Sequence, residues 1–167
     1  MSQSTKIWYA VYVRSRTEKK VALELTYNEI DNYLPLVKRL KQWSDRKKWV
    51  EEPLFRSYIF VCIEQNDYFN VTQTQGVVKY ISFEGKAVPI PDEQILAIKY
   101  YLEETDPEKI DSAKWSKGQK VEVISGSMVG LKGELIEVNG KNRLKVEIEA
   151  IGSSLLIYIP KSKLRKI

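Results

Sequence analysis

The sequence contains no histidine and a single cysteine, Cys62, among its 167 residues. The absence of histidine excludes catalytic schemes built on imidazole and most zinc sites. One cysteine cannot form an internal disulfide, which agrees with a reducing compartment. No run approaches the roughly 20 apolar residues that span a bilayer, and residues 1–6 lack the apolar segment of a signal peptide. We therefore expect a cytoplasmic protein that needs no cofactor and no metal.

The sequence also lacks a catalytic constellation. Cys62 lies inside an apolar run without a basic neighbour, so its thiol is expected to be an inert core group. Carboxylate pairs lie in polar segments that favour solvation. Gly126, Gly130 and Gly133 lack the Lys-Ser/Thr pair and the helix of a phosphate loop, so tight turns explain them better. We expect a binding protein and not an enzyme.

Positive charge gathers in a few places, although the formal net charge is only +5. Residues 1–106 carry 15 basic and 15 acidic residues, whereas residues 107–167 carry 12 and 7. The densest basic segment is Lys161–Lys166, and two further clusters lie at Arg14–Lys20 and Lys38–Lys48. Such clusters attract a phosphate backbone through Coulomb attraction and counterion release. A solvated, solubilising face is the alternative, with about equal weight.

Hydrophobic periodicity predicts a mixed α+β unit in the first part of the chain. We expect strands at Ile7–Val13, Leu36–Gln42, Phe55–Ile63 and Val77–Phe83, and helices over Thr17–Ile30, Asp67–Thr74 and Pro91–Leu102. Thr17 is placed to cap the first helix, and Trp43–Glu52 suits a long hairpin or loop. The order of the elements is close to that of a ferredoxin-like unit.

Short β runs dominate the second part of the chain. They lie at Val121–Ile124, Leu131–Val138, Arg143–Ile148 and Leu155–Ile159, and Asn139-Gly140 between two of them is a strong hairpin signal. About fifty such residues suggest a small SH3-like barrel. We therefore expect a first domain at residues 1–104, a polar, proline-broken linker at 105–116 and a barrel at 117–167.

The two most apolar strands carry large side chains on both faces. In Ile7–Val13, Trp8 and Tyr12 alternate with other apolar residues, and Phe55–Ile63 shows the same pattern. An open sheet with helices on one side buries only one of its faces. The second, aromatic face must then be covered by a loop of the same chain, for which Trp43–Glu52 is the obvious choice, or by a partner. The sequence leaves both explanations open.

Taken together, these patterns resemble the NusG family of transcription elongation factors. The first strand contains the Trp8-Tyr9 pair of the family, Glu52–Val61 is very similar to the core strand of RfaH-type paralogues, and Gly76–Ile81 resembles the next strand. The segment from Lys117 to Val146, with its glycines, resembles a KOW module. The resemblance covers nearly the whole chain in the correct order. It implies an α+β fold, with a ferredoxin-like NusG N-terminal (NGN) domain followed by an SH3-like KOW β-barrel.

The resemblance also implies a binding site for RNA polymerase. The NGN domain of such factors binds the clamp helices of the largest polymerase subunit through an exposed apolar hollow, and desolvated aromatic residues are the usual anchors of such interfaces. Binding there favours the active conformation of the polymerase and so suppresses pausing and termination. The matching residues in this sequence are Tyr12, Leu54, Phe55, Tyr58 and Tyr80.

RfaH-type paralogues also contact the non-template DNA strand with basic and polar residues. A patch of this kind can read a short unpaired sequence. Two positions depart from the RfaH-type pattern: Tyr68-Phe69-Asn70 replaces a threonine-rich segment, and Gln75 replaces an arginine. The residues implied in nucleic-acid binding here are Arg14, Arg16, Lys19, Lys20, Thr74 and Gln75.

The expected function is transcription antitermination in long operons, such as the capsular polysaccharide loci served by UpxY-type factors. A general housekeeping NusG is one alternative, and a ribosome-associated RNA-binding KOW protein that uses Lys161–Lys166 is another. For the barrel, the resemblance implies a ribosomal small-subunit protein or a termination factor as partner. We expect a monomer. Because Val121–Ile124 and Leu155–Ile159 strongly prefer strands, we predict a stable barrel without the helical refolding of RfaH-type factors.

Overall fold

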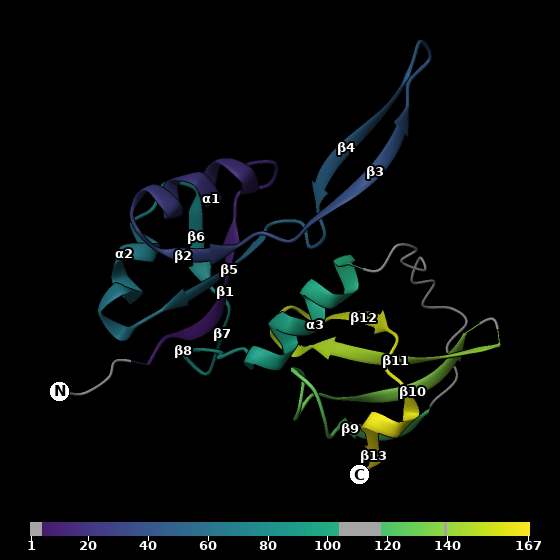
Figure 1. The fold of residues 1–167 in the computed structure, drawn as a ribbon. Coiled ribbons are helices and arrows are strands. Elements are labelled where there is room, and N and C mark those ends of the chain that lie inside the picture. The colour runs from purple at the N-terminus through teal and green to yellow at the C-terminus, as the bar shows by residue number, and fades with distance from the viewer. Residues whose placement is uncertain (1–4, 104–117, 139) are drawn as a thin grey trace. The chain divides into compact units, whose positions relative to one another are not determined.

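The protein divides into two compact units, Met1–Ile90 and Pro91–Ile167. The computed structural model in Figure 1 describes residues 5–103, 118–138 and 140–167. The expected linker at 105–116 lies outside the described residues. The last helix before it, α3 (Asp92–Glu103), is grouped with the second unit, while the expected domain boundaries at residues 104 and 117 stay predictions.

The first unit contains a four-stranded antiparallel sheet with the strand order β2-β5-β1-β6. This order, with a helix after the first strand and another before the last, is the ferredoxin-like arrangement that the sequence predicts. Two separate hairpins, β3–β4 and β7–β8, complete the unit. Its elements are β1 (Ile7–Val13), α1 (Glu18–Tyr27), β2 (Asp31–Tyr33), β3 (Leu36–Gln42), β4 (Lys47–Pro53), β5 (Tyr58–Ile63), a 3-10 turn (Gln65–Asp67), α2 (Tyr68–Thr72), β6 (Val77–Tyr80), β7 (Ser82–Phe83) and β8 (Lys86–Ala87).

One face of this sheet forms the core with the two helices. Val21 and Leu25 of α1 and Val71 of α2 are buried against side chains such as Val11 and Ile59 in the two central strands. These side chains alternate along their strands, as a half-buried sheet requires. The helices therefore cover the face that carries the odd-numbered residues of β1 and β5.

Two local expectations for the first unit are wrong. Strand β5 begins at Tyr58 and not at Phe55, because Ser57 has a left-handed backbone (φ 67°) that interrupts the extended chain. Thr17 precedes α1 but does not cap it with its side chain. Its hydroxyl donates instead to the carbonyl oxygen of Arg14, 2.6 Å away, and so closes the turn between β1 and α1.

The second face of the sheet is closed at its centre without the help of the β3–β4 hairpin. Phe60 is fully buried there, with the rings of Phe55 and Tyr33 edge-on at 6.1 and 6.5 Å between ring centroids. Figure 1 shows that β3 and β4 extend away from the four-stranded sheet. The expectation that Trp43–Glu52 covers this face is therefore wrong, and the turn before β5 supplies the covering ring.

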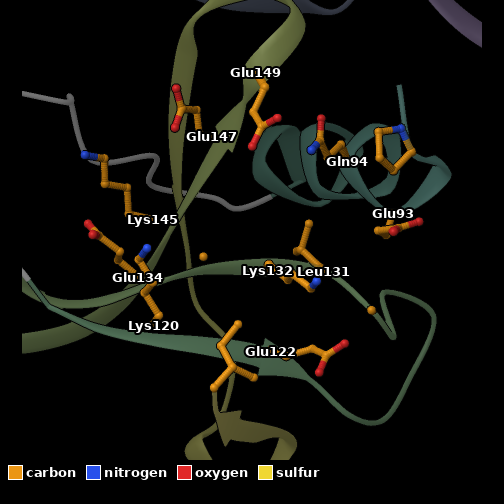
Figure 2. Close-up of a pocket in the computed structure, with 14 residues that line it drawn as sticks. Glu93, Gln94, Lys120, Glu122, Leu131, Lys132, Glu134, Lys145, Glu147 and Glu149 are labelled. Carbon is orange, nitrogen blue, oxygen red and sulfur yellow. The ribbon is translucent and has the colours of Figure 1, made fainter. Parts of the chain in front are cut away.

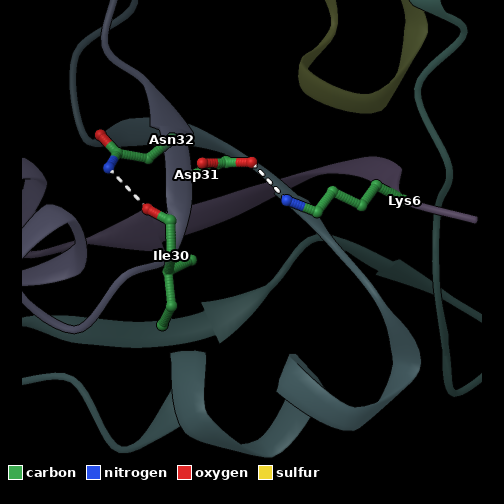
Figure 3. Close-up of polar contacts among 4 residues, drawn as sticks. All are labelled: Lys6, Ile30, Asp31 and Asn32. Carbon is green, nitrogen blue, oxygen red and sulfur yellow. Dashed lines mark hydrogen bonds and ion pairs between the residues drawn. The ribbon is translucent and has the colours of Figure 1, made fainter. Parts of the chain in front are cut away.

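An exposed ion pair connects the start of β1 to β2 across the intervening strand. Figure 3 shows the Lys6 ammonium donating to the Asp31 carboxylate at 2.6 Å, and the Asn32 amide donating to the Ile30 carbonyl at 3.0 Å. The hydrogen bond to Asp31 raises the pKa of Lys6 above its ordinary value. Since both side chains of the pair are exposed, the pair orders the sheet edge more than it stabilises the fold.

The second unit is a five-stranded antiparallel sheet with the order β12-β11-β10-β9-β13, joined by α3. Together with the first unit it gives the mixed α+β fold expected from the sequence. The strands of this unit are β9 (Gln119–Val123), β10 (Lys132–Val138), β11 (Lys141–Ile148), β12 (Ser153–Ile157) and β13 (Leu164–Lys166), with 3-10 turns at Glu149–Ile151 and Lys161–Lys163.

Strand β13 was not expected from the sequence. It pairs with β9, and Arg165 forms an ion pair with Glu122 at 2.5 Å. The second half of the basic segment Lys161–Lys166 is thus part of the sheet, and its first half forms the 3-10 turn before β13. Gly133 was expected in a tight turn, but it lies within β10. An added Cβ there would stand 2.4 Å from the Lys145 carbonyl oxygen. Glycine is therefore required by close packing of the strands and not by a turn.

Among the described residues, no helix has the length and apolar character that crossing a membrane requires.

Candidate functional site

An aromatic pair lies at one end of the second face of the four-stranded sheet. Tyr12 of β1 stands directly opposite Tyr58 of β5, and the two rings meet edge-on with centroids 5.9 Å apart. Tyr12 is 37% exposed and Tyr58 is half-buried. Leu54, half-buried, and Phe55 precede Tyr58 in the β4–β5 turn. We call these four residues the aromatic corner.

Within the aromatic corner, Phe55 has a different role from the two tyrosines. It is only 8% exposed, and its ring packs against Phe60. The amide of Tyr58 donates to the Phe55 carbonyl at 3.4 Å, which tightens the turn. Phe55 thus supports the surface that Tyr12 and Tyr58 present to solvent.

Tyr80, also expected in this hollow, lies on the opposite face of the sheet. It pairs with Val11 in the β1–β6 register, and residues directly opposite each other share a face. Its ring stacks on Tyr68 at 4.1 Å, and its hydroxyl donates to the Tyr68 carbonyl at 2.7 Å. Burial raises the pKa of the Tyr80 phenol above its ordinary value. Lys79, which the sequence did not single out, is the exposed residue beside Tyr12.

A basic surface lies next to the aromatic corner. Arg14 and Arg16 are exposed in the turn after β1, and Lys19 and Lys20 are exposed in the first turn of α1. The amide of Arg14 donates to the Gly76 carbonyl at 3.1 Å, which brings this turn beside the one before β6. We call these four residues the basic turn.

The two polar residues expected to join the basic turn differ in accessibility. Gln75 is exposed and lies beside the residue that Arg14 contacts. Thr74 is buried, and its hydroxyl donates to the Asn70 carbonyl at 3.2 Å, which caps α2. Thr74 therefore shapes the turn, while Gln75 is available to a ligand.

Gly76 allows this turn to approach α1. Its backbone is left-handed (φ 94°), and an added Cβ would stand 2.5 Å from a methyl carbon of Val21. A side chain at this position would push the turn away from the helix. Only glycine satisfies both demands, so the sequence signal for this contact is the glycine itself.

Glu18 connects the aromatic corner to the basic turn. Its buried carboxylate accepts the backbone N–H of Arg16 at 3.3 Å and that of Ser57 at 3.2 Å, both on the same oxygen. Ser57 immediately precedes Tyr58, and Arg16 belongs to the basic turn. The sequence analysis did not identify this residue, because an acidic residue in the first turn of a helix is ordinary.

The second unit offers a mixed-charge hollow of about 840 Å³. Figure 2 shows glutamates and lysines from α3 and the strands interleaved around it. Alternating charges leave no field of one sign to select an anion or a cation. Over residues 5–103, 118–138 and 140–167, no group of three or more acidic, cysteine or histidine side chains is arranged to hold a metal ion.

Comparison with models of protein families gives a match that spans more than half of the chain. The family model described as "Transcription termination factor nusG" matches residues 6–99. The match runs from β1 into α3 and therefore includes both the aromatic corner and the basic turn.

Two solved structures are also similar to this chain. One is described as "Domain interaction in Thermotoga maritima NusG", with 22% identity, 97% of each chain covered and a TM-score of 0.47. The other is described as "Crystal Structure of MjSpt4:Spt5 complex conformation B", with 18% identity, 96% of each chain covered and a TM-score of 0.33. The family assignment depends on the family-model match, and on that ground the chain belongs to the NusG family of transcription factors, whose members are not enzymes.

Proposed function

We propose that this protein is an elongation and antitermination factor that binds RNA polymerase and DNA through two adjacent surfaces. The aromatic corner binds the clamp helices of the largest polymerase subunit. The basic turn, with Gln75, binds the non-template DNA strand of the transcription bubble. The protein acts by stabilising the active polymerase conformation, which is a population shift and not catalysis.

The observation that carries this proposal is the partly exposed Tyr12–Tyr58 pair at the edge of a face whose centre, at Phe60, is buried. Aromatic side chains with a polar tip are typical anchors of protein interfaces because they bury a large area and still satisfy their hydroxyls. The basic turn is joined to this pair through Glu18. A surface for protein and a surface for phosphate therefore lie side by side.

The polymerase contact is tested by substituting the two tyrosines of the aromatic corner and not Phe55. Tyr12→Ala combined with Tyr58→Ala is expected to weaken binding of purified polymerase by about thirtyfold or more, the loss of one strong interface anchor. Tyr27→Ala is the matched control, because Tyr27 is an exposed tyrosine on α1 outside the aromatic corner. Equal affinity of the folded double variant and the control would contradict the proposal.

Phe55→Ala has a different expected outcome. Because the ring is buried against Phe60, truncation creates a cavity and is expected to destabilise the first unit by about 3–5 kcal/mol. A loss of polymerase binding in that variant would then reflect the fold as well as the contact.

The DNA contact is tested by reversing charge at Arg14 and Lys20. The double variant Arg14→Glu, Lys20→Glu is expected to weaken crosslinking to the non-template strand. It should also reduce the slope of log affinity against log salt by about one to two units, since each phosphate contact on a single strand contributes about 0.7. Charge reversal at the exposed Lys86 on β8 is the control. An unchanged slope in the double variant would locate DNA binding elsewhere.

We further propose a specialised role of the RfaH or UpxY type, in long operons such as capsular polysaccharide loci. A specialised factor acts only on templates with its recruiting sequence, whereas a housekeeping factor acts on any template. In vitro transcription on a template that carries the leader of the factor's own operon, against one without it, separates these roles. The barrel unit is proposed to contact a ribosomal small-subunit protein or a termination factor.

A further inference from the structure

The β3–β4 hairpin has a composition that the two surfaces above do not use. Residues 36–53 contain six basic and three acidic residues, and two tryptophans. The strands pair over their full length, from Leu36 opposite Pro53 to Gln42 opposite Lys47. At about 3.3 Å per residue, the paired strands reach about 20 Å. The hairpin is therefore a long, cationic arm.

The two faces of this hairpin carry different side chains. On one face, Arg39 and Lys41 share a single ion-pair partner, Glu52, which offsets one of their two charges. On the other face, Trp49 stands opposite Leu40. Lys38 and Lys47 lie two residues along from this pair and share its face, because side chains alternate along a strand.

The face with Trp49 carries the exposed indole, two lysines and one glutamate, Glu51, which stands opposite Lys38 in the register. Trp49 is 65% exposed, and it borders, with Lys38, Val50 and Glu51, a shallow hollow of about 460 Å³. Within the described parts of the chain, no ion pair of Lys38 or Lys47 is present. An indole flanked by two lysines offers a ring on which a base can stack and cations for the adjoining phosphates.

A hydrogen bond joins the hairpin to the basic turn. The Lys19 ammonium donates to the backbone carbonyl of Glu51 at 2.8 Å, and Glu51 lies in β4 two residues from Trp49. The positive surface therefore continues from the start of α1 onto the hairpin. A single strand bound at the basic turn can continue along the face that carries Trp49.

We propose that the Trp49 face of the β3–β4 hairpin binds unpaired bases of single-stranded DNA, as an extension of the site at the basic turn. This inference rests on the proposed function, because it extends the same DNA strand. Stacking requires bases that are not paired, so single strands bind this face and duplex DNA does not. The exposed ring gives the strand a contact that tolerates any sequence.

The test measures the affinity of the full chain for a labelled oligo(dT) single strand by fluorescence polarisation. Trp49→Ala is expected to weaken binding by about fivefold or more, the loss of one stacked base, while Trp49→Phe keeps most of the affinity. The matched control is Phe83→Ala, which removes an exposed ring from the other hairpin, β7–β8. Trp49 is exposed, so its variants should fold, which circular dichroism checks.

Each outcome decides a different point. Unchanged affinity for Trp49→Ala, with reduced affinity for the Arg14→Glu, Lys20→Glu variant, overturns the hairpin proposal and leaves the proposed function intact. Unchanged affinity in both variants overturns the DNA part of the proposed function. Binding of oligo(U) more tightly than oligo(dT), or of a duplex as tightly as the single strand, also overturns the hairpin proposal.

Discussion

Two residues near the proposed interfaces have left-handed backbones although neither is glycine: Arg16 (φ 66°) and Ser57 (φ 67°). Such conformations cost about 1–3 kcal/mol each and persist where other interactions fix them. Both backbone amides donate to one oxygen of Glu18. A single buried carboxylate therefore holds the two turns from which the basic and aromatic side chains project.

Replacing Glu18 tests this role. Glu18→Ala leaves the amides of Arg16 and Ser57 without their acceptor, at a cost of about 1–3 kcal/mol. We expect amide hydrogen exchange at Ser57 to become about tenfold faster or more, because local opening becomes easier. Glu18→Gln keeps an acceptor oxygen at the same place and should retain most of the protection. Equal exchange in the Ala variant and the parent protein would show that the carboxylate is not needed.

At the residue scale, the sequence predicted which aromatic residues belong to the sheet better than it predicted the face of the sheet on which each one lies. Tyr12 and Tyr58 are together on one face, as expected, while Tyr80 is on the other. The reason is register: β6 pairs with β1 so that Lys79, and not Tyr80, stands opposite Tyr12. A shift of one residue reverses the face of every side chain in a strand, and register depends on contacts distant in sequence.

Among the helices and strands, those with a regular hydrophobic pattern, or with a residue such as proline that marks their start or end, were predicted well. Strands β1 and β3 have the expected bounds, and α3 begins after Pro91, with Ile95 and Ile98 buried and Leu102 half-buried. Strand β13 was missed because Leu164–Lys166 is mostly charged, and its pairing with β9 is a long-range contact. Short polar strands of this kind are stabilised by their neighbours and not by their own composition.

The β3–β4 hairpin should respond to acid. The hydrogen bond from Lys41, with the charges of Lys41 and Arg39, lowers the pKa of Glu52 below its ordinary value of 4.5. Because the folded-state pKa is the lower one, the stabilisation by Glu52 is complete above about pH 4.5 and is lost as pH falls through the folded-state pKa.

We therefore expect the amides of β3 and β4 to lose hydrogen-exchange protection, relative to the central sheet, when acid protonates Glu52. The variant Glu52→Gln should lack this pH dependence and exchange at neutral pH as the parent protein does in acid. Hairpin protection that is identical at neutral and acidic pH in the parent protein would contradict the assignment.

For the whole molecule, the second unit is expected to keep its strands. Val121, Val146, Leu155 and Ile157 are buried in its sheet, and β-branched residues at such positions favour strands. Far-ultraviolet circular dichroism of the full chain should show no gain of helix on warming before cooperative unfolding. A rise in helical signal below the unfolding transition would indicate the helical refolding that the sequence argues against.

The buried carboxylate of Glu18 has a consequence for how two ligands are held at once. The turn after β1 and the turn before β5 both donate a backbone N–H to the same oxygen atom of Glu18. We therefore expect the two turns to move together. If one turn is fixed on a protein partner, the other fixes where a nucleic-acid strand passes that partner. On the proposed function, the protein itself would then set the spacing between the polymerase and the DNA strand.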